Sequence, residues 1–178
     1  MKQLKTYTIF ILLLLASALQ AYAHISRNIF MLSNVNVDNG LSSPRVYSIV
    51  EAEDGAMWIS TKRGVDRYNG QQVTNYTLST EMPYSDASGR RIKLTKDAQH
   101  QIYAYDNKGK VYIYNKVKDT FVLKCNLLNI LGGSIVLNEL LIDEKGNFWL
   151  AMDKGLYCLS TATDGKEIVR ETAKGRLP

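Results

Sequence analysis

The chain has 178 residues, of which 46% are hydrophobic and 22% are charged, a composition typical of an ordinary globular domain. Its 22 Lys and Arg against 17 Asp and Glu give a formal net charge of +5, which is too mild and too scattered to indicate nucleic-acid binding. Three Pro and two Cys exclude a proline-rich linker and a disulfide-stapled miniprotein, so an apolar core must hold the fold.

The first 23 residues have the three parts of a secretory signal. Lys2 and Lys5 supply the positive start, residues 9–19 are uncharged, and residues 21–23 form an Ala-Tyr-Ala cleavage site. A membrane anchor is the alternative, but such a run reaches only about 16 Å as a helix, roughly half of a bilayer's hydrocarbon core. We therefore predict a signal peptide at 1–23 and an exported mature chain that begins at His24.

A strand-like run at 28–37 precedes the repeats described next and has no repeat of its own. In propellers such an orphan strand often completes the last blade and closes the ring, so we predict a closing strand here. At the other end, residues 171–178 are polar and lack a closing element. This ending indicates a cut rather than a natural finish.

One sequence pattern occurs three times between residues 48 and 159. The glycines that follow the second run of each copy, Gly64, Gly109 and Gly155, are 45 and 46 residues apart. A period in the forties with β-branched and aromatic runs is typical of propeller blades. Helical repeats of similar period would instead need apolar residues at a spacing of 3.6, so helix is the weaker interpretation.

Each copy divides into four runs bounded by turn residues. In the first copy the turns include Asp54-Gly55 and Asn69-Gly70, which favour tight connections between antiparallel strands because both residue types tolerate positive φ. The predicted fold class is therefore all-β, a partial β-propeller of about three four-stranded antiparallel blades after the signal peptide. Within a domain at 24–178, the predicted blades span about 41–80, 90–126 and 137–171.

Trp58 and Trp149 are the only tryptophans and occupy the same repeat position, with Ile102 assigned to that position in the degenerate middle copy. We interpret both as large side chains that pack one blade on the next. Stacking against a ligand is the alternative. The three repeat glycines are interpreted as structural positions.

The first copy closely resembles the two-component regulator propeller repeat, which reads approximately G-L-S, V, I, D-G, W-I-G-T, G-L and R-Y-N-G. The matching residues are 38–49, Asp54-Gly55, 58–61 and 64–70. Ser60 stands where Gly is usual, and the copy at 92–114 lacks the Trp and the Asp-Gly turn. The resemblance covers all of the mature chain.

This resemblance implies the N-terminal part of the periplasmic ligand-sensing propeller of a Bacteroidetes-type hybrid two-component sensor histidine kinase and response regulator. Such receptors have two seven-bladed propellers, a β-sandwich module, a membrane helix, a kinase, often a receiver, and an AraC-like DNA-binding domain. They commonly respond to oligosaccharides, pass the signal on by phosphorelay and act as homodimers. The implied location is the periplasm, with the parent anchored in the inner membrane by a downstream helix; this segment contacts no nucleic acid.

Two other functions stay open: a secreted propeller enzyme acting on polysaccharide, and a stand-alone binding module or a sensor with a different output. We predict no catalytic residue in this chain, because His24 and His100 lack a phosphoacceptor context and no Gly-rich ATP-binding pattern occurs. Cys125 and Cys158 are interpreted as small buried thiols, with a disulfide as the alternative. The acidic turns do not match a calcium loop, so we expect neither a metal nor a cofactor.

Three basic residues are the candidate ligand contacts. Lys62 and Arg63 lie in the loop between the second and third strands of the first blade, and Arg45 precedes its innermost strand. In propellers these loops gather on one face around the axis, where ligands usually bind. Arg can fork onto a carboxylate such as that of a uronic acid, whereas the alternative is simple solvation.

Overall fold

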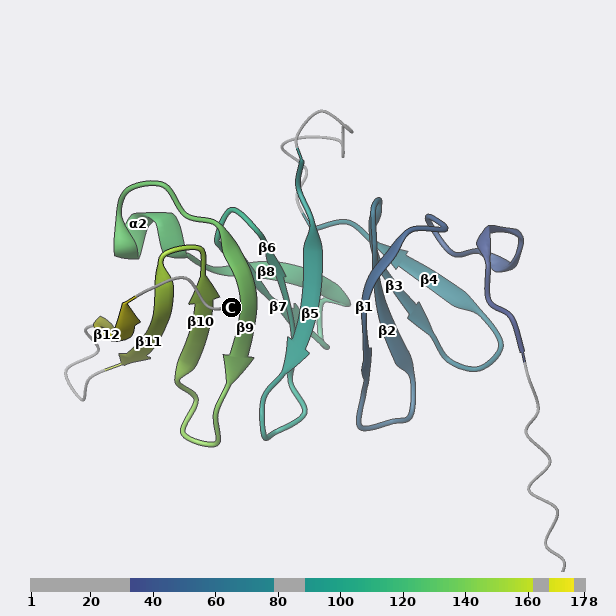
Figure 1. Ribbon diagram of the computed structural model, residues 1–178. Coiled ribbons are helices and arrows are strands. Elements are labelled where there is room, and N and C mark those ends of the chain that lie inside the picture. Colours follow the sequence, from purple (N-terminus) through teal and green to yellow (C-terminus); the bar gives the residue numbers. More distant parts are fainter. Residues whose placement is uncertain (1–32, 79–88, 162–166, 175–178) are drawn as a thin grey trace, which may run out of the picture. The chain divides into compact units, whose positions relative to one another are not determined.

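The computed structural model describes residues 33–78, 89–161 and 167–174 (Figure 1). The described residues from Val35 onward belong to one compact unit. The predicted signal peptide at 1–23 and His24 lie outside the described residues.

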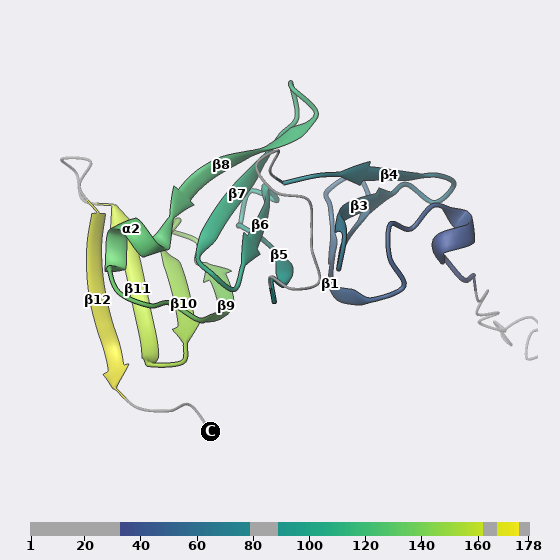
Figure 2. The same cartoon turned by 90° about the horizontal axis from the view of Figure 1, so that it is seen from above.

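Three four-stranded antiparallel sheets make up the described unit, and each sheet keeps its strands in chain order (Figures 1 and 2). Blade 1 contains β1 (Val46–Glu51), β2 (Met57–Thr61), β3 (Gly64–Tyr68) and β4 (Val73–Tyr76). Blade 2 contains β5 (Ile92–Lys96), β6 (Ile102–Asp106), β7 (Lys110–Asn115) and β8 (Thr120–Asn126). Blade 3 contains β9 (Leu137–Ile142), β10 (Phe148–Met152), β11 (Gly155–Thr161) and β12 (Glu167–Lys174). The predicted all-β class with three four-stranded antiparallel blades is confirmed.

The first strands of the three blades lie next to one another. The backbone N–H of Leu94 in β5 donates to Ser48 Oγ in β1 at 2.8 Å. On the other side of β5, Lys93 Nζ donates to the carbonyl oxygen of Asn138 in β9 at 2.9 Å. The order along the unit is therefore blade 1, blade 2, blade 3, with β5 between β1 and β9.

The core lies between the sheets rather than within any one of them. A first cluster joins blades 1 and 2, and a second joins blades 2 and 3. Blade 2 contributes to both because its strands alternate their side chains between two covered faces. The first cluster is built from Trp58, Val65, Tyr76, Leu78, Ile92, Leu94, Ile102, Ala104, Tyr112 and Phe121. The second is built from Tyr103, Tyr105, Val111, Leu127, Leu137, Leu140, Phe148, Leu150, Met152 and Leu159.

The closing strand predicted at 28–37 is not found in the part of that segment that the structure describes. Residues 33–36 have no regular secondary structure, and Val37 begins a short 3₁₀ helix, η1 (Val37–Asn39). The Asn36 side chain caps this helix by accepting from the backbone N–H groups of Asp38 and Asn39. Such side-chain capping favours a turn over an extended strand. Residues 28–32 lie outside the described ranges.

A short helix that the sequence did not predict, α2 (Leu127–Leu131), connects blade 2 to blade 3. Asn126 caps its start, and Gly132 ends it. Leu127 is fully buried in the second cluster, and its backbone N–H donates to the carbonyl oxygen of Gly109 at 2.8 Å. The helix thus covers the β6–β7 turn with an apolar residue.

Strand register corrects the assignment of Ile102 to the tryptophan position. Trp58, Tyr103 and Trp149 occupy the second position of β2, β6 and β10, and each lies six residues before its repeat glycine. Tyr103 faces blade 3, as Trp58 faces blade 2, whereas Ile102 packs in the cluster with blade 1. A shift of one residue along a strand moves a side chain to the opposite face of the sheet, so Tyr103 is the equivalent residue.

Candidate functional site

One rim of the unit is formed where the turn between the second and third strands of each blade meets the residue before the first strand. The backbone N–H of Lys62 donates to the carbonyl oxygen of Arg45 at 3.0 Å. The equivalent bonds are Asn107 to Arg91 and Asp153 to Val136, both 3.2 Å. We call this set of turns and preceding residues the turn rim.

The structure brings the three sequence-predicted ligand candidates together on the turn rim of blade 1. Arg45 and Arg63 are exposed, and Lys62 is half-buried. The same rim holds Arg91, which the sequence analysis did not include among the ligand candidates. Its position is equivalent to that of Arg45, so the repeat period of 46 residues between them was the signal that could have identified it.

A buried polar network fixes this part of the rim. Asp66 is fully buried, and its Oδ2 accepts from the backbone N–H and the hydroxyl of Ser42, both at 2.8 Å. Asn75 donates to its other oxygen at 2.8 Å. Thr61 Oγ1 lies 2.7 Å from Ser42 Oγ and accepts from the backbone N–H of Arg63 at 3.1 Å. The loop before β1 and the β2–β3 turn are therefore held to one sheet by satisfied hydrogen bonds.

Gly64 is required at this turn for two reasons. Its φ is 149°, in a region that side-chain-bearing residues rarely adopt. A Cβ placed there would lie 2.6 Å from the carbonyl oxygen of Tyr76 in β4. Gly109 is also confined, because its Cβ would approach Leu127 Cβ to 3.1 Å. Gly155 keeps the same conformation as Gly64, with a φ of 146°.

Trp58 lies between blades 1 and 2 and is 1% exposed. Its ring centroid is 4.6 Å from that of Tyr114 and 5.5 Å from that of Phe121, both in blade 2. On its own sheet it is capped by Arg67, whose guanidinium lies 5.8 Å from the ring centroid and pairs with Asp54. This geometry joins two blades and leaves almost none of the indole surface for a ligand.

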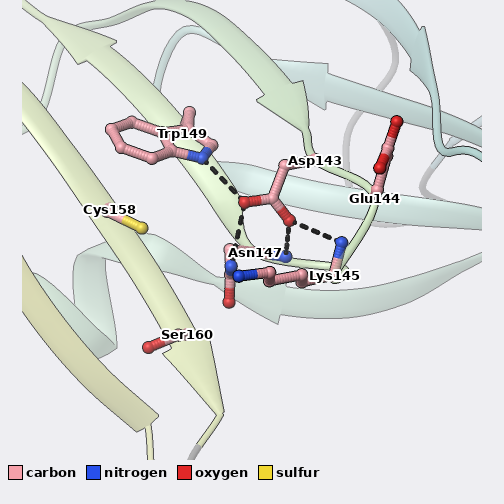
Figure 3. Close-up of a pocket in the computed structure, with 7 residues that line it drawn as sticks. All are labelled: Asp143, Glu144, Lys145, Asn147, Trp149, Cys158 and Ser160. Carbon is pink, nitrogen blue, oxygen red and sulfur yellow. Dashed lines mark hydrogen bonds between the residues drawn. The ribbon is translucent and has the colours of Figure 1, made fainter.

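Trp149 has a different environment in blade 3, where it lines a cavity of about 510 Å³ (Figure 3). Its indole N–H donates to Asp143 Oδ2 at 3.0 Å, and Asn147 Nδ2 donates to the same oxygen at 2.9 Å. The other oxygen accepts from the backbone N–H groups of Lys145 and Asn147, both at 2.9 Å. These hydrogen bonds to the charged form lower the pKa of Asp143 to about 2.

The cavity beside Trp149 has the position of an interface between blades. The same face of blade 1 is covered by Tyr114 and Phe121 of the next blade. Next to Trp149, Leu141 is 61% exposed, and no described residue outside blade 3 lines the cavity. Every polar contact of Asp143 braces its own hairpin, so this carboxylate is already used for the structure of blade 3.

The remaining candidate groups do not form a catalytic arrangement. Within the described ranges, no three His, Cys, Asp or Glu side chains come close enough to hold a metal ion. His100 is exposed in the β5–β6 turn. Cys125 and Cys158 are half-buried rather than fully buried, and neither forms a disulfide. Neither helix in the described ranges has the length or the apolar character needed to cross a bilayer.

Three consecutive four-stranded meanders, packed face to face around adjacent first strands, define a β-propeller-type domain. Residues 40–63 match the family model described as two component regulator propeller. Residues 40–63 thus match the repeat that the sequence predicted. No curated protein matches the chain.

Solved structures share the fold. Two crystal structures of the extracellular domain of BT4673 from B. thetaiotaomicron, described as a one-component or a hybrid two-component system, match with TM-scores of 0.56 and 0.60 at 18% identity. These matches cover 75% and 79% of this chain but 17% and 18% of those chains. The extracellular domain of BT3049 from the same organism, described as a hybrid two-component system, matches with a TM-score of 0.55 at 16% identity, covering 78% of this chain and 20% of that chain. The chain thus spans a fifth or less of the length of these structures.

Proposed function

We propose that this chain is the N-terminal part of the periplasmic ligand-sensing propeller of a hybrid two-component histidine kinase, and that the receptor responds to carbohydrate. The observation that carries the proposal is the regulator propeller repeat at 40–63, whose rim geometry recurs in blades 2 and 3. The fold shared with extracellular domains of proteins described as two-component systems supports it. The signal-like sequence at 1–23 supports export to the periplasm.

In this proposal the sensor works by a population shift. A ligand that binds one arrangement of a receptor dimer more tightly shifts the dimer toward that arrangement, and a kinase beyond the membrane responds to the shift. The chain contributes a rigid element, because its blades share apolar cores and its turn rim is held by buried hydrogen bonds.

Further blades would follow blade 3 in the proposed receptor. The support is the exposed face formed by Leu141 and Trp149, whose counterpart in blade 1 is covered by aromatic residues of the next blade. The small fraction of the matched structures that this chain spans agrees with a longer sensor.

A genetic experiment tests the sensing function. The gene is deleted from its host, and transcripts are measured during growth on single polysaccharides. We expect one group of genes to lose its induction by one polysaccharide, and the intact gene supplied in trans to restore it. Unchanged transcript responses on every polysaccharide would contradict the proposal.

Export is tested separately with alkaline phosphatase, which is active only outside the cytoplasm. A fusion to residues 1–40 should be active, and a matched fusion to residues 24–40 should be inactive. Equal activity of the two fusions would contradict export by the N-terminal segment. The sensing function would then be judged by the gene-deletion experiment alone.

A further inference from the structure

Charged side chains are distributed unequally between the two ends of the blades. The exposed or half-buried basic residues of the turn rim are Arg45, Lys62, Arg63, Arg90, Arg91, Lys108 and Lys154. The opposite hairpins, which join the first and second strands, carry Glu51, Glu53, Asp54, Asp97, Asp143 and Glu144, with Lys96 and Lys145. The β7–β8 turn at that same end adds Lys116, Lys118 and Asp119, so one end of the unit is basic and the other is acidic on balance.

The basic residues recur at equivalent positions of the blades. Arg63, Lys108 and Lys154 each come directly before the repeat glycine of their blade. Arg45 and Arg91 are the two residues whose carbonyl oxygens accept from the β2–β3 and β6–β7 turns. Because the three first strands lie next to one another, this repetition places positive charge along the rim of all three blades.

Few carboxylates on the same rim are available to pair with these basic side chains. Asp66 and Asp106 are almost completely buried and are occupied by internal hydrogen bonds. Asp106 pairs with Arg90 at 2.7 Å, which accounts for one of the cations. No ion pair joins Arg45, Arg63, Arg91 or Lys108 to another residue of the described ranges. Asp153 is the one exposed acid at these three turns.

A cavity of about 170 Å³ opens on this rim between blades 2 and 3. Arg91, Lys93, Asn107 and Asn138 supply its polar groups, and Tyr105 and Leu137 supply its apolar surface. Lys93 Nζ is held at 2.7 Å from Glu139 Oε2 and 2.9 Å from the Asn138 carbonyl oxygen, while Tyr105 donates to the same carboxylate. Of the two basic residues that line this cavity, Lys93 is ion-paired, and within the described ranges Arg91 is not.

We propose that the turn rim binds an acidic oligosaccharide, with one carboxylate or sulfate held in the cavity at Arg91 and further acidic groups along Arg45, Arg63 and Lys108. This inference rests on the proposed sensing function and names its ligand class. An extended ligand fits because these four cations are distributed over blades 1 and 2, which a single small anion cannot span. Planar guanidinium groups favour carboxylate and sulfate oxygens through paired hydrogen bonds.

The test is calorimetric binding to the purified full-length protein. The probes are tetragalacturonic acid and a heparin tetrasaccharide, with maltotetraose as the neutral control. We expect an acidic probe to bind and maltotetraose not to bind. The Arg63→Ala/Arg91→Ala double variant should bind the acidic probe about tenfold or more weakly than the parent. This is the effect expected for the loss of charge-assisted hydrogen bonds. The control double variant Lys116→Ala/Lys118→Ala removes the same charge from the other end of blade 2 and should bind as the parent does.

Equal weakening by both double variants would mean nonspecific electrostatic attraction and would overturn the rim site. Binding of maltotetraose alone would overturn the acidic ligand class while leaving a carbohydrate sensor in place. Absence of binding by every probe would also overturn the inference. The proposed sensing function fails only if gene deletion leaves all transcript responses unchanged, so the two failures are distinguishable.

Discussion

Trp58 and Trp149 occupy the same position in blades 1 and 3, yet Trp58 is 1% exposed and Trp149 is half-buried beside a cavity of about 510 Å³. The difference comes from what covers each blade. Tyr114 and Phe121 of blade 2 pack on Trp58, whereas the contact of Trp149 among the described residues is with Asp143 of its own hairpin. Tryptophan at this position therefore packs in a covered interface in blade 1 and lies at an uncovered face in blade 3.

Trp58→Ala is expected to destabilise the protein by about 3–5 kcal/mol, because it removes a buried ring from the core between two blades. The free energy of unfolding from urea denaturation measures the loss. Trp149→Ala is the matched control and should cost clearly less, since its ring is not covered by a neighbouring blade. Equal losses for the two variants would contradict the difference in packing.

Gly64→Ala is expected to destabilise more than Gly55→Ala. Both glycines have positive φ, a backbone cost of roughly 1–2 kcal/mol for an L side chain. Only at Gly64 does the new Cβ also meet a backbone oxygen, that of Tyr76 at 2.6 Å, while Gly55 has open space around it. Melting temperatures of the two variants provide the measurement, and a similar decrease in both would argue against the close approach of β3 and β4.

Asp66→Ala is expected to cost about 1–3 kcal/mol for each buried group left without its partner, with the Ser42 backbone N–H affected first. Asp54→Ala is the control, because it removes one ion pair with Arg67 and one hydrogen bond from the Ala56 backbone N–H, and it should cost less than Asp66→Ala. Chemical denaturation of both variants compares them. A smaller loss for Asp66→Ala than for Asp54→Ala would contradict the assigned role of the buried network.

Asp143 should make the protein less stable in acid. Its pKa is lowered from 3.8 to about 2, first by the hydrogen bond from Asn147 and then by that from Trp149. A carboxyl group whose pKa is lower in the folded than in the unfolded state stabilises the fold above about pH 4. This stabilisation is lost as the pH falls toward 2. Asp143→Asn lacks this contribution. The difference in unfolding free energy between the parent and this variant should therefore shrink as the pH falls from 4 toward 2. Denaturation curves at several pH values measure it, and a constant difference would show that Asp143 is not responsible.

A polypeptide of residues 24–178 is expected to associate in solution, because the open faces of its end blades include Ile49 and Leu141, which are 56% and 61% exposed. Leu141→Lys should reduce the association by placing a charge on the face beside Trp149. Leu123→Lys is a control at another exposed leucine, 54% exposed in β8. Sedimentation measures the state of each, and a monomer with a sharp, reversible thermal transition would contradict the expectation.

Local features of the sequence were sufficient to predict the repeat and most of its strands. The Asn69-Gly70 turn and the Gly64, Gly109 and Gly155 spacing predict four-stranded meanders, because glycine is the residue that tolerates positive φ at a tight connection. The same local patterns failed at 33–37, where Asn36 caps a turn, and at α2, whose five residues are too few to show a helical period.

Tertiary packing decided what the pattern left ambiguous. We predicted Ile102 at the tryptophan position, and the face of the sheet on which each side chain packs assigns Tyr103 to it instead. Packing also decided that Trp58 is covered and that Trp149 is half-buried. By itself the sequence determined the type of repeat, since turn chemistry and side-chain alternation act over a few residues. Only the tertiary structure decided which faces are covered and which charges meet, because those depend on contacts between residues about 45 positions apart.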